Sequence, residues 1–320
     1  MAIDEMYHRE CAWNDIFDID ERETVQEGFL VTGLISVVLG SWLNFALFTS
    51  NLKLDRSYNN LANFTLTSCV RRLVPVFSQL TFIKYMERWQ GFQNFKCDFF
   101  GFWETFLAVL EIECLTHVCI ERYVLAKYNT NGWPMQKRHY TLYLCLCFFF
   151  STLYSCPPLF GIGQYGYDFT CTSCTFDMIL PNNWKRGFVI IIFLLRSVKP
   201  TVVMSMMLIW CRSLEKKYRN TSHLNEINFT RSTVSMTCLN LLCWTPIAII
   251  RASVVMSQLF NSDEVWKPAA SYVKWAMWLH WVSPALTVIN LFLVDEQIRK
   301  TMFSLCAPNN STEEDKDKDD

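Results

Sequence analysis

Seven apolar stretches, each long enough to cross a lipid bilayer, set the strongest limit on how this 320-residue chain folds. A helix of roughly 20 residues spans the hydrocarbon core. Hydrophobic residues make up 51% of the chain, too many for an ordinary soluble domain. Charges interrupt several stretches, and hydropathy alone leaves the second, third and fifth uncertain. The stretches cover residues 28–50, 62–83, 98–120, 140–161, 187–211, 229–260 and 269–294.

The charges at the ends of these stretches orient the chain. Basic residues gather in the connections that would face the cytoplasm, whereas the N-terminal tail is acidic, so the positive-inside rule places the N-terminus outside. No cleavable signal pattern opens the sequence, and the first stretch is expected to act as the targeting signal. We expect a multi-pass protein of the plasma membrane, surrounded by lipid. The basic residues are Lys53, Arg56, Lys127, Lys137, Arg138, Arg212, Lys216, Lys217 and Arg219.

The predicted fold is all-α: an integral membrane bundle of seven transmembrane helices with a short amphipathic eighth helix. The net charge of −1 suggests neither nucleic acid nor an acidic substrate as a partner. The sequence shows no metal-ligand spacing and no hydrolase motif, so we expect no metal site and no enzyme. The expected divisions are an extracellular tail over 1–27, a transmembrane domain over 28–294, the eighth helix over 295–306 and an acidic cytoplasmic tail over 307–320.

Most of the fourteen cysteines lie inside apolar stretches, where cysteine acts as a small hydrophobe. Cys97 begins the third stretch on the outer side, and Cys174 lies in the outer loop before the fifth. Both face an oxidising compartment, which predicts a disulfide between them. Cys11 and Cys171 are also outside and form a candidate second bridge.

Glu121-Arg122-Tyr123 stands at the inner end of the third stretch. An arginine there is costly for a membrane helix unless something uses it. A helix from Cys97 to Arg122 is long enough to cross the bilayer, with a cysteine near one face and the charged triplet near the other.

With further motifs, this layout resembles the rhodopsin-like (class A) G-protein-coupled receptors and, within them, the opsins. Asn44 resembles the first-helix asparagine, Pro200 the fifth-helix proline, and Cys243-Trp244-Thr245-Pro246 the sixth-helix signature. The loop motifs over 156–161 and 172–177 resemble the opsin lid over retinal. The likeness covers nearly all of residues 28–306. The stretch over 289–296 resembles the retinochrome, retinal G-protein-coupled receptor and peropsin branch.

The resemblance breaks down at the residue that carries an opsin's chemistry. Opsins hold retinal as a Schiff base on a seventh-helix lysine, and this reaction needs a primary amine. Two alignments place Trp281 or Met277 at that position. Lys274 lies roughly 10 Å nearer the outside, as a displaced retinal lysine or an interfacial one. We therefore expect no covalent retinal and no other cofactor.

The candidate ligand-binding residues are ionisable or aromatic side chains inside the stretches. Glu104 either meets a cationic ligand beside Trp281, as in the amine receptors that the chain resembles, or pairs internally with Arg196. Arg196, Arg251 and Lys274 also point roughly toward this region, which leaves an anionic or zwitterionic ligand open. Trp244 is expected to face the ligand.

A buried ion pair between Arg72 and Glu111 is expected deeper in the bundle, where relatives bind sodium; Arg71 is the alternative partner. Glu113 has no evident role.

At the inner end, Glu226 and Arg122 are a candidate inactive-state salt bridge between the third and sixth helices, with Glu121 as the local partner and a generic interfacial pair as the alternative. The tyrosines that relatives use to hold the released arginine are replaced by Leu208 and by Leu291 or Thr287.

The sequence thus favours a receptor for a small non-covalent ligand, charged and possibly an amine, that signals to a heterotrimeric G protein through sixth-helix movement. The alternatives are a retinoid-binding photoisomerase or photoreceptor and a non-signalling pseudoreceptor.

Overall fold

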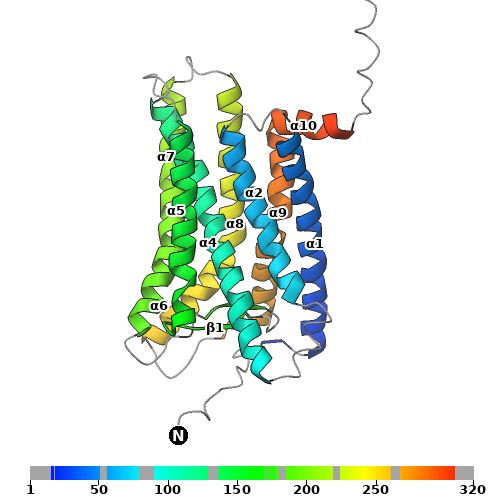
Figure 1. The fold of residues 1–320 in the computed structure, drawn as a ribbon, viewed down its shortest axis with the longest axis vertical. Helices are drawn as coiled ribbons and strands as arrows, with labels where there is room; N and C mark the ends of the chain where they lie inside the picture. The colour runs from blue at the N-terminus through cyan, green and yellow to red at the C-terminus, as the bar shows by residue number, and fades with distance from the viewer. Residues whose placement is uncertain are drawn as a thin grey trace, which may run out of the picture.

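Seven long helical segments form the bulk of the described chain, packed side by side as a bundle in the computed structural model (Figure 1). They are α1 (Ile19–Thr49), α2 (Arg56–Ser78), α4 (Gln90–Tyr128), α5 (Lys137–Ser155), α6 (Lys185–Phe193) continued through the π-helical turn η4 (Leu194–Val198) into α7 (Lys199–Tyr218), α8 (Leu224–Phe260) and α9 (Ala270–Val294). The structure describes residues 16–17, 19–50, 56–78, 90–128, 136–169, 171, 173–177, 179, 185–218, 224–260 and 267–306. The predicted seven-helix membrane bundle is confirmed.

The short helix α10 (Glu296–Cys306) lies across one end of the bundle, beside the ends of α1 and α9 (Figure 1). It is amphipathic, because Ile298 and Met302 are buried while the charged Glu296 and Lys300 are exposed. This helix is the predicted eighth. At the other end, α1 begins at Ile19 rather than at residue 28, where its apolar stretch starts.

Five of the helices are apolar enough by composition to cross a membrane: Glu23–Thr49, Lys137–Phe160, Arg186–Ser213, Phe229–Phe260 and Ala270–Val294. Hydropathy alone was expected to leave the second, third and fifth stretches uncertain as membrane spans. For the fifth this was wrong, since Arg186–Ser213 has the highest mean hydropathy of the five, 1.9. The other two, α2 and α4, carry buried ionisable side chains at their middles, among them Arg71 and Glu111. Such charges need partners inside the bundle.

The π-helical turn η4 changes which side chains face inward along the fifth crossing. The N–H of Lys199 bonds to the carbonyl of Leu194, five residues earlier, and Pro200 follows with no N–H to donate. Arg196 is the buried residue of this turn, whereas Leu194, Leu195 and Val198 are exposed on the outer surface. The turn therefore directs a charged side chain into the bundle.

A two-stranded antiparallel hairpin covers the end of the bundle opposite α10 (Figure 1). Its strands are β1 (Tyr165–Tyr167) and β2 (Cys174–Phe176). The predicted Cys97–Cys174 disulfide is confirmed and ties β2 to α4. Cys171 is also disulfide-bonded; Cys11, its suggested partner, lies outside the described residues.

The ring of Tyr165 rests directly on Gly101 of α4, and its hydroxyl donates to the carbonyl of Ser155 on α5. A Cβ at Gly101 would lie 2.8 Å from ring atoms of Tyr165, too close for any real contact. The missing side chain at Gly101 thus allows the hairpin to seat against the bundle.

We predict that Gly101→Ala lowers the melting temperature of the purified protein by a few degrees, because overpacking at such a site costs about 1–3 kcal/mol. Gly28→Ala is the matched control, since a Cβ there would meet nothing within 4 Å. It should leave the melting temperature unchanged or slightly higher. Equal melting temperatures for the two variants would contradict the seating of Tyr165.

Candidate functional site

Arg71 of α2 is the centre of a buried charge cluster in the half of the bundle nearer the hairpin. Its Nε and Nη2 donate to Oε1 of Glu104 at 2.8 and 2.7 Å, and its Nη1 donates to Oε2 of Glu111 at 2.7 Å. Nη2 also lies 2.9 Å from Nε2 of His280 on α9. Arg71 is 3% exposed and Glu111 is fully buried. One guanidinium thus joins α2, α4 and α9.

These contacts correct two predicted pairs. The partner of Glu111 is Arg71, the alternative that the sequence left open, rather than Arg72. The internal partner of Glu104 is again Arg71 and not Arg196. Consecutive helical residues point about 100° apart, so only one of Arg71 and Arg72 can face the two glutamates of α4.

Arg72 points instead toward α9. Its Nη2 donates to the carbonyl of His280 at 2.6 Å, and its guanidinium lies 5.5 Å from the ring centroid of Trp281. Trp281 is itself buried and stacks on Phe29 of α1 at 5.5 Å between centroids. The cation beside this indole is therefore supplied by the protein itself, and the indole is held between α1 and α2.

Arg196 and Arg251 complete the cluster from the fifth and sixth crossings. The charges of Arg251, Arg71 and Glu104 all act on Arg196, which is 4% exposed. Arg251 is half-buried, and the charges of Arg71, Glu104 and Asp168 act on it. Within the described part of the chain, neither Arg196 nor Arg251 has a hydrogen bond or an ion pair, and Nη1 of Arg196 is buried without a partner.

Trp244 of α8 is buried, and its Nε1 donates to Oγ of Ser283 on α9 at 3.4 Å. It lies two residues before Pro246, which is inside α8. A proline in a helix interior removes a backbone hydrogen bond and permits a kink. Trp244 therefore links α9 to the part of α8 that contains the proline.

Lys274, which the sequence analysis treated as a candidate for a displaced retinal-binding lysine, faces outward. Lys274 is 48% exposed and its Nζ lies 3.3 Å from Glu21 of α1. It is the single lysine of α9. Met277 and Trp281, at the two positions that alignment suggests, are both buried and carry no amine.

At the opposite end of the bundle, Arg122 contacts the adjacent Glu121 and side chains of two other helices. Its Nη2 lies 2.7 Å from Oε1 of Glu121 and donates to Oγ of Ser57 at 2.5 Å. Its guanidinium also lies 4.3 Å from the ring centroid of Phe229 on α8. Tyr123 packs against Trp210 of α7 at 5.6 Å. The side chain of Glu226, the predicted lock, lies outside the described residues.

Sequence reasoning missed several partners of these charges. Glu121 accepts hydrogen bonds from Ser57 at 2.5 Å, from Asn60 at 2.8 Å and from Tyr140 of α5 at 3.0 Å. Glu113, which had no evident role, pairs with Lys199 at 2.6 Å. No sequence motif predicts these contacts, because they join residues that are distant in sequence.

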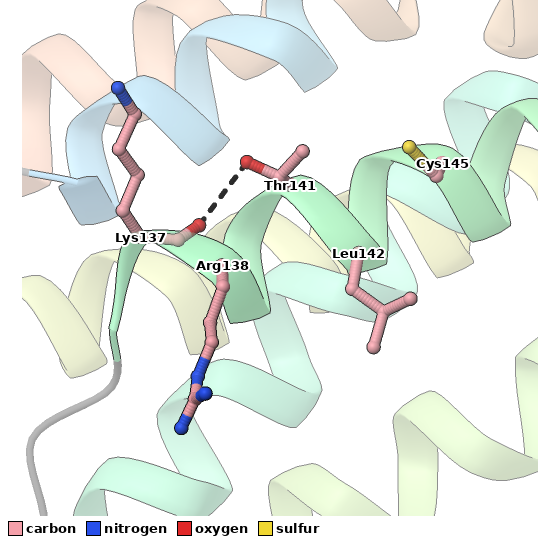
Figure 2. Close-up of a pocket in the computed structure, with 5 residues that line it drawn as sticks. All are labelled: Lys137, Arg138, Thr141, Leu142 and Cys145. Atoms are coloured by element: carbon pink, nitrogen blue, oxygen red, sulfur yellow. Dashed lines mark hydrogen bonds between the residues drawn. The ribbon is translucent and has the colours of Figure 1, made fainter.

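A surface hollow at the end of α5 is lined by Lys137, Arg138, Thr141, Leu142 and Cys145. Figure 2 shows Arg138 and Leu142 extending from one side of α5 and Lys137 from the other. Tyr140 of the same turn reaches Glu121, so the hollow lies at the Arg122 end of the bundle, far from the Arg71 cluster. It presents two basic residues and no buried charge.

The comparisons with known proteins all indicate the same family. The profile of the 7 transmembrane receptor (rhodopsin family) matches residues 60–287. A Gq-coupled rhodopsin of Mizuhopecten yessoensis is 27% identical over 241 residues, 69% of this chain and 48% of the relative. Opsin-5 of Mus musculus is 23% identical over 242 residues, 70% of this chain and 64% of the relative.

The chain thus spans about half to two thirds of the length of these two curated relatives. The crystal structure of squid rhodopsin superposes with a TM-score of 0.74 at 17% identity, over 91% of this chain and 87% of that one. A likeness at that identity supports the fold.

We predict that Arg71→Met destabilises the protein by about 3–5 kcal/mol, because two carboxylates would be left buried without their cation. The readout is the melting temperature together with cell-surface expression. Arg212→Met, at an exposed position on α7, is the matched control and should change neither.

Adding Glu104→Gln and Glu111→Gln to Arg71→Met should recover most of the lost stability, because no unpaired charge then remains. A wild-type melting temperature for Arg71→Met alone would show that the cluster does not hold the helices together.

Proposed function

This chain belongs to the rhodopsin family of seven-transmembrane receptors, and on that premise we propose that it is a plasma-membrane receptor that binds a small ligand without a covalent bond and signals to a heterotrimeric G protein. Its N-terminus would be extracellular and the end bearing Arg122 would face the cytoplasm. The basic pair Lys137 and Arg138 at that end favours this orientation.

The observation that carries the non-covalent mode of binding is the environment of α9. A Schiff base needs a primary amine facing the interior, and the single lysine of this helix is exposed and paired with Glu21. The buried side chains at the depth of the expected site are Met277 and Trp281. Neither can form an imine.

The proposed ligand site lies under the hairpin, among Glu104, Arg196 and Arg251, with Trp244 at its deeper end. A ligand that contacts Trp244 or Arg251 acts on α8, the helix that Pro246 weakens. Movement of the inner half of α8 is the switch we propose, a rigid-body change of the kind common in bistable bundles.

At the inner end, this movement would withdraw Phe229 from Arg122. The inactive state is then held by an aromatic contact from α8 and by Glu121 and Ser57, in addition to any contribution of Glu226. Release of Arg122 would open the surface that a G protein reads.

A retinoid-binding opsin is the second candidate, and the relatives named rhodopsin and Opsin-5 favour it. In this chain such a retinoid would have to bind without an imine. A non-signalling pseudoreceptor is the third candidate, because Leu208 and Leu291 are buried where relatives carry tyrosines.

We predict that incubation with 11-cis or all-trans retinal, followed by borohydride reduction and mass spectrometry, leaves no adduct on α9. Trp281→Lys supplies a buried amine at the aligned depth and serves as the positive control for the chemistry. An adduct on wild type that disappears in Lys274→Arg would overturn the non-covalent reading.

We predict that Phe229→Ala raises basal nucleotide exchange on a G protein by a factor of about 5 to 30, since a desolvated cation–π contact of about 1–2 kcal/mol holds the inactive state. Arg122→Ala should abolish exchange. Leu242→Ala, exposed on the same helix, is the control and should match wild type. Identical output from all four proteins would instead favour the pseudoreceptor.

A further inference from the structure

We infer that the ligand of this receptor carries a carboxylate, bound by Arg196 together with Arg251 beneath the hairpin. This inference rests on the proposed function and names the chemical class of its ligand. It follows from the charge balance of the cluster, from its unpartnered hydrogen-bonding atoms and from the way the fold presents Arg196.

The charge balance of the cluster is positive. Four arginines, Arg71, Arg72, Arg196 and Arg251, share the site with the carboxylates of Glu104, Glu111 and Asp168. When the half-buried Arg251 is counted with the three buried arginines, one positive charge is left in excess among the described residues. A buried charge without a counter-ion costs several kcal/mol in an environment of low dielectric constant, and a single carboxylate would neutralise it.

Arg196 is the cation that the cluster leaves unmatched. Arg71 makes ion pairs with both glutamates, and Arg72 is stabilised by the carbonyl of His280 and the face of Trp281. Arg71 repels Arg251 as well, but two carboxylates, those of Glu104 and Asp168, act on Arg251 in the opposite direction. Arg251 and Arg71 repel Arg196, and the opposing carboxylate of Glu104 already forms an ion pair with Arg71. As described above, Arg196 itself lacks an ion pair within the described residues.

The unpartnered polar atoms of the cluster are mostly donors. Among the buried atoms that the structure describes, Nη1 of Arg196, Nε of Arg72 and Nδ1 of His280 have no partner, as against one acceptor, Oε2 of Glu104. Arginine only donates, so Nε2 of His280 accepts from Arg71 and its Nδ1 carries the proton. A site with surplus donors suits a ligand rich in acceptors.

The same facts disfavour an amine as the ligand, which the sequence analysis had left as a possibility. Glu104, the acidic residue that would meet an amine, already accepts two hydrogen bonds from Arg71 on one oxygen. Any cation approaching it would also meet the field of the other arginines. A carboxylate, by contrast, matches the planar fork of a guanidinium with two parallel hydrogen bonds.

The fold presents Arg196 to this site by a local distortion. The π-helical turn η4 buries Arg196 while its neighbours face the membrane, and such turns are frequent at functional sites. Tyr165 of the hairpin lies within electrostatic reach of Arg196. Phe193, Ile247 and Ile250 lie within about one helical turn of Arg196 or Arg251 and belong to the apolar core that contains Trp281, so the acid should carry an apolar body.

The test uses three probes that share one skeleton: 4-phenylbutyrate, 4-phenylbutanamide and 4-phenylbutylamine, which are anionic, neutral and cationic at pH 7. Each is titrated against the purified full-length receptor while the melting temperature is measured. The carboxylate should raise the melting temperature by about 5 °C near saturation. The amide and the amine should leave it unchanged.

Arg196→Gln should abolish the shift produced by the carboxylate, and its ligand-free melting temperature should equal or exceed that of wild type, because an unpaired buried charge has been removed. Arg138→Gln, at the other end of the bundle, is the matched control and should keep the full shift. Arg196→Lys should keep part of it.

Three results would overturn the inference: a carboxylate shift that persists in Arg196→Gln, a larger shift with the amine, or a lower ligand-free melting temperature in Arg196→Gln, which would reveal a structural partner. Each of these results is distinguishable from failure of the proposed function. If the protein activates a G protein but prefers the amine, the proposed function stands and the carboxylate inference fails. If it binds the carboxylate through Arg196 but never signals, the inference stands and the proposed function fails.

Discussion

The ion pairs of Arg71 with Glu104 and Glu111 are the interaction on which the rest of the charge cluster depends. A single guanidinium takes up both carboxylates of α4, and its contact with His280 adds α9 to the same junction. Arg72 must then find a carbonyl and an aromatic face, and Arg196 is left without a counter-ion. The contacts of Arg72 with α9 and the lack of a counter-ion at Arg196 both follow from that choice of partner.

This constraint also explains why α2 and α4 are helices of the bundle although they are less apolar than the others. Their charges would be prohibitive against lipid, but each faces a partner on a neighbouring helix, and the outward faces stay apolar. Arg71 and Glu111 are buried, whereas Leu66, Val70 and Phe99 on the same two helices are exposed. The two helices therefore depend on one another, while α1, α8 and α9 could each cross a membrane alone by composition.

The sequence predicted the fold well because its signals are long and redundant. The apolar stretches, the outer cysteines and the amphipathic segment after residue 295 each survive an error of a few residues. The contacts of the site are harder to predict. An error of one residue in the alignment turns a helical side chain by about 100°, which is the difference between Arg71 and Arg72 as the partner of Glu111. Tyr140 and Ser57 reach Glu121 from other helices, and spacing along the chain carries no record of such contacts. The contact of His280 with Arg71 was missed for the same reason.

The two ends of the bundle differ in how fully their arginines are satisfied, and α8 contributes to both. At the inner end Arg122 has Glu121, Ser57 and the ring of Phe229, so the closed arrangement needs no external partner. At the outer end Arg196 has no ion pair within the described chain, and the charge of Arg251 on α8 acts on it. A ligand shifts an equilibrium only by its difference in affinity for two states. If an anion draws Arg251 and Arg196 together, it relieves their repulsion and therefore binds more tightly to the state in which they are close. Arg251 belongs to α8, which is also the helix that must move Phe229 away from Arg122.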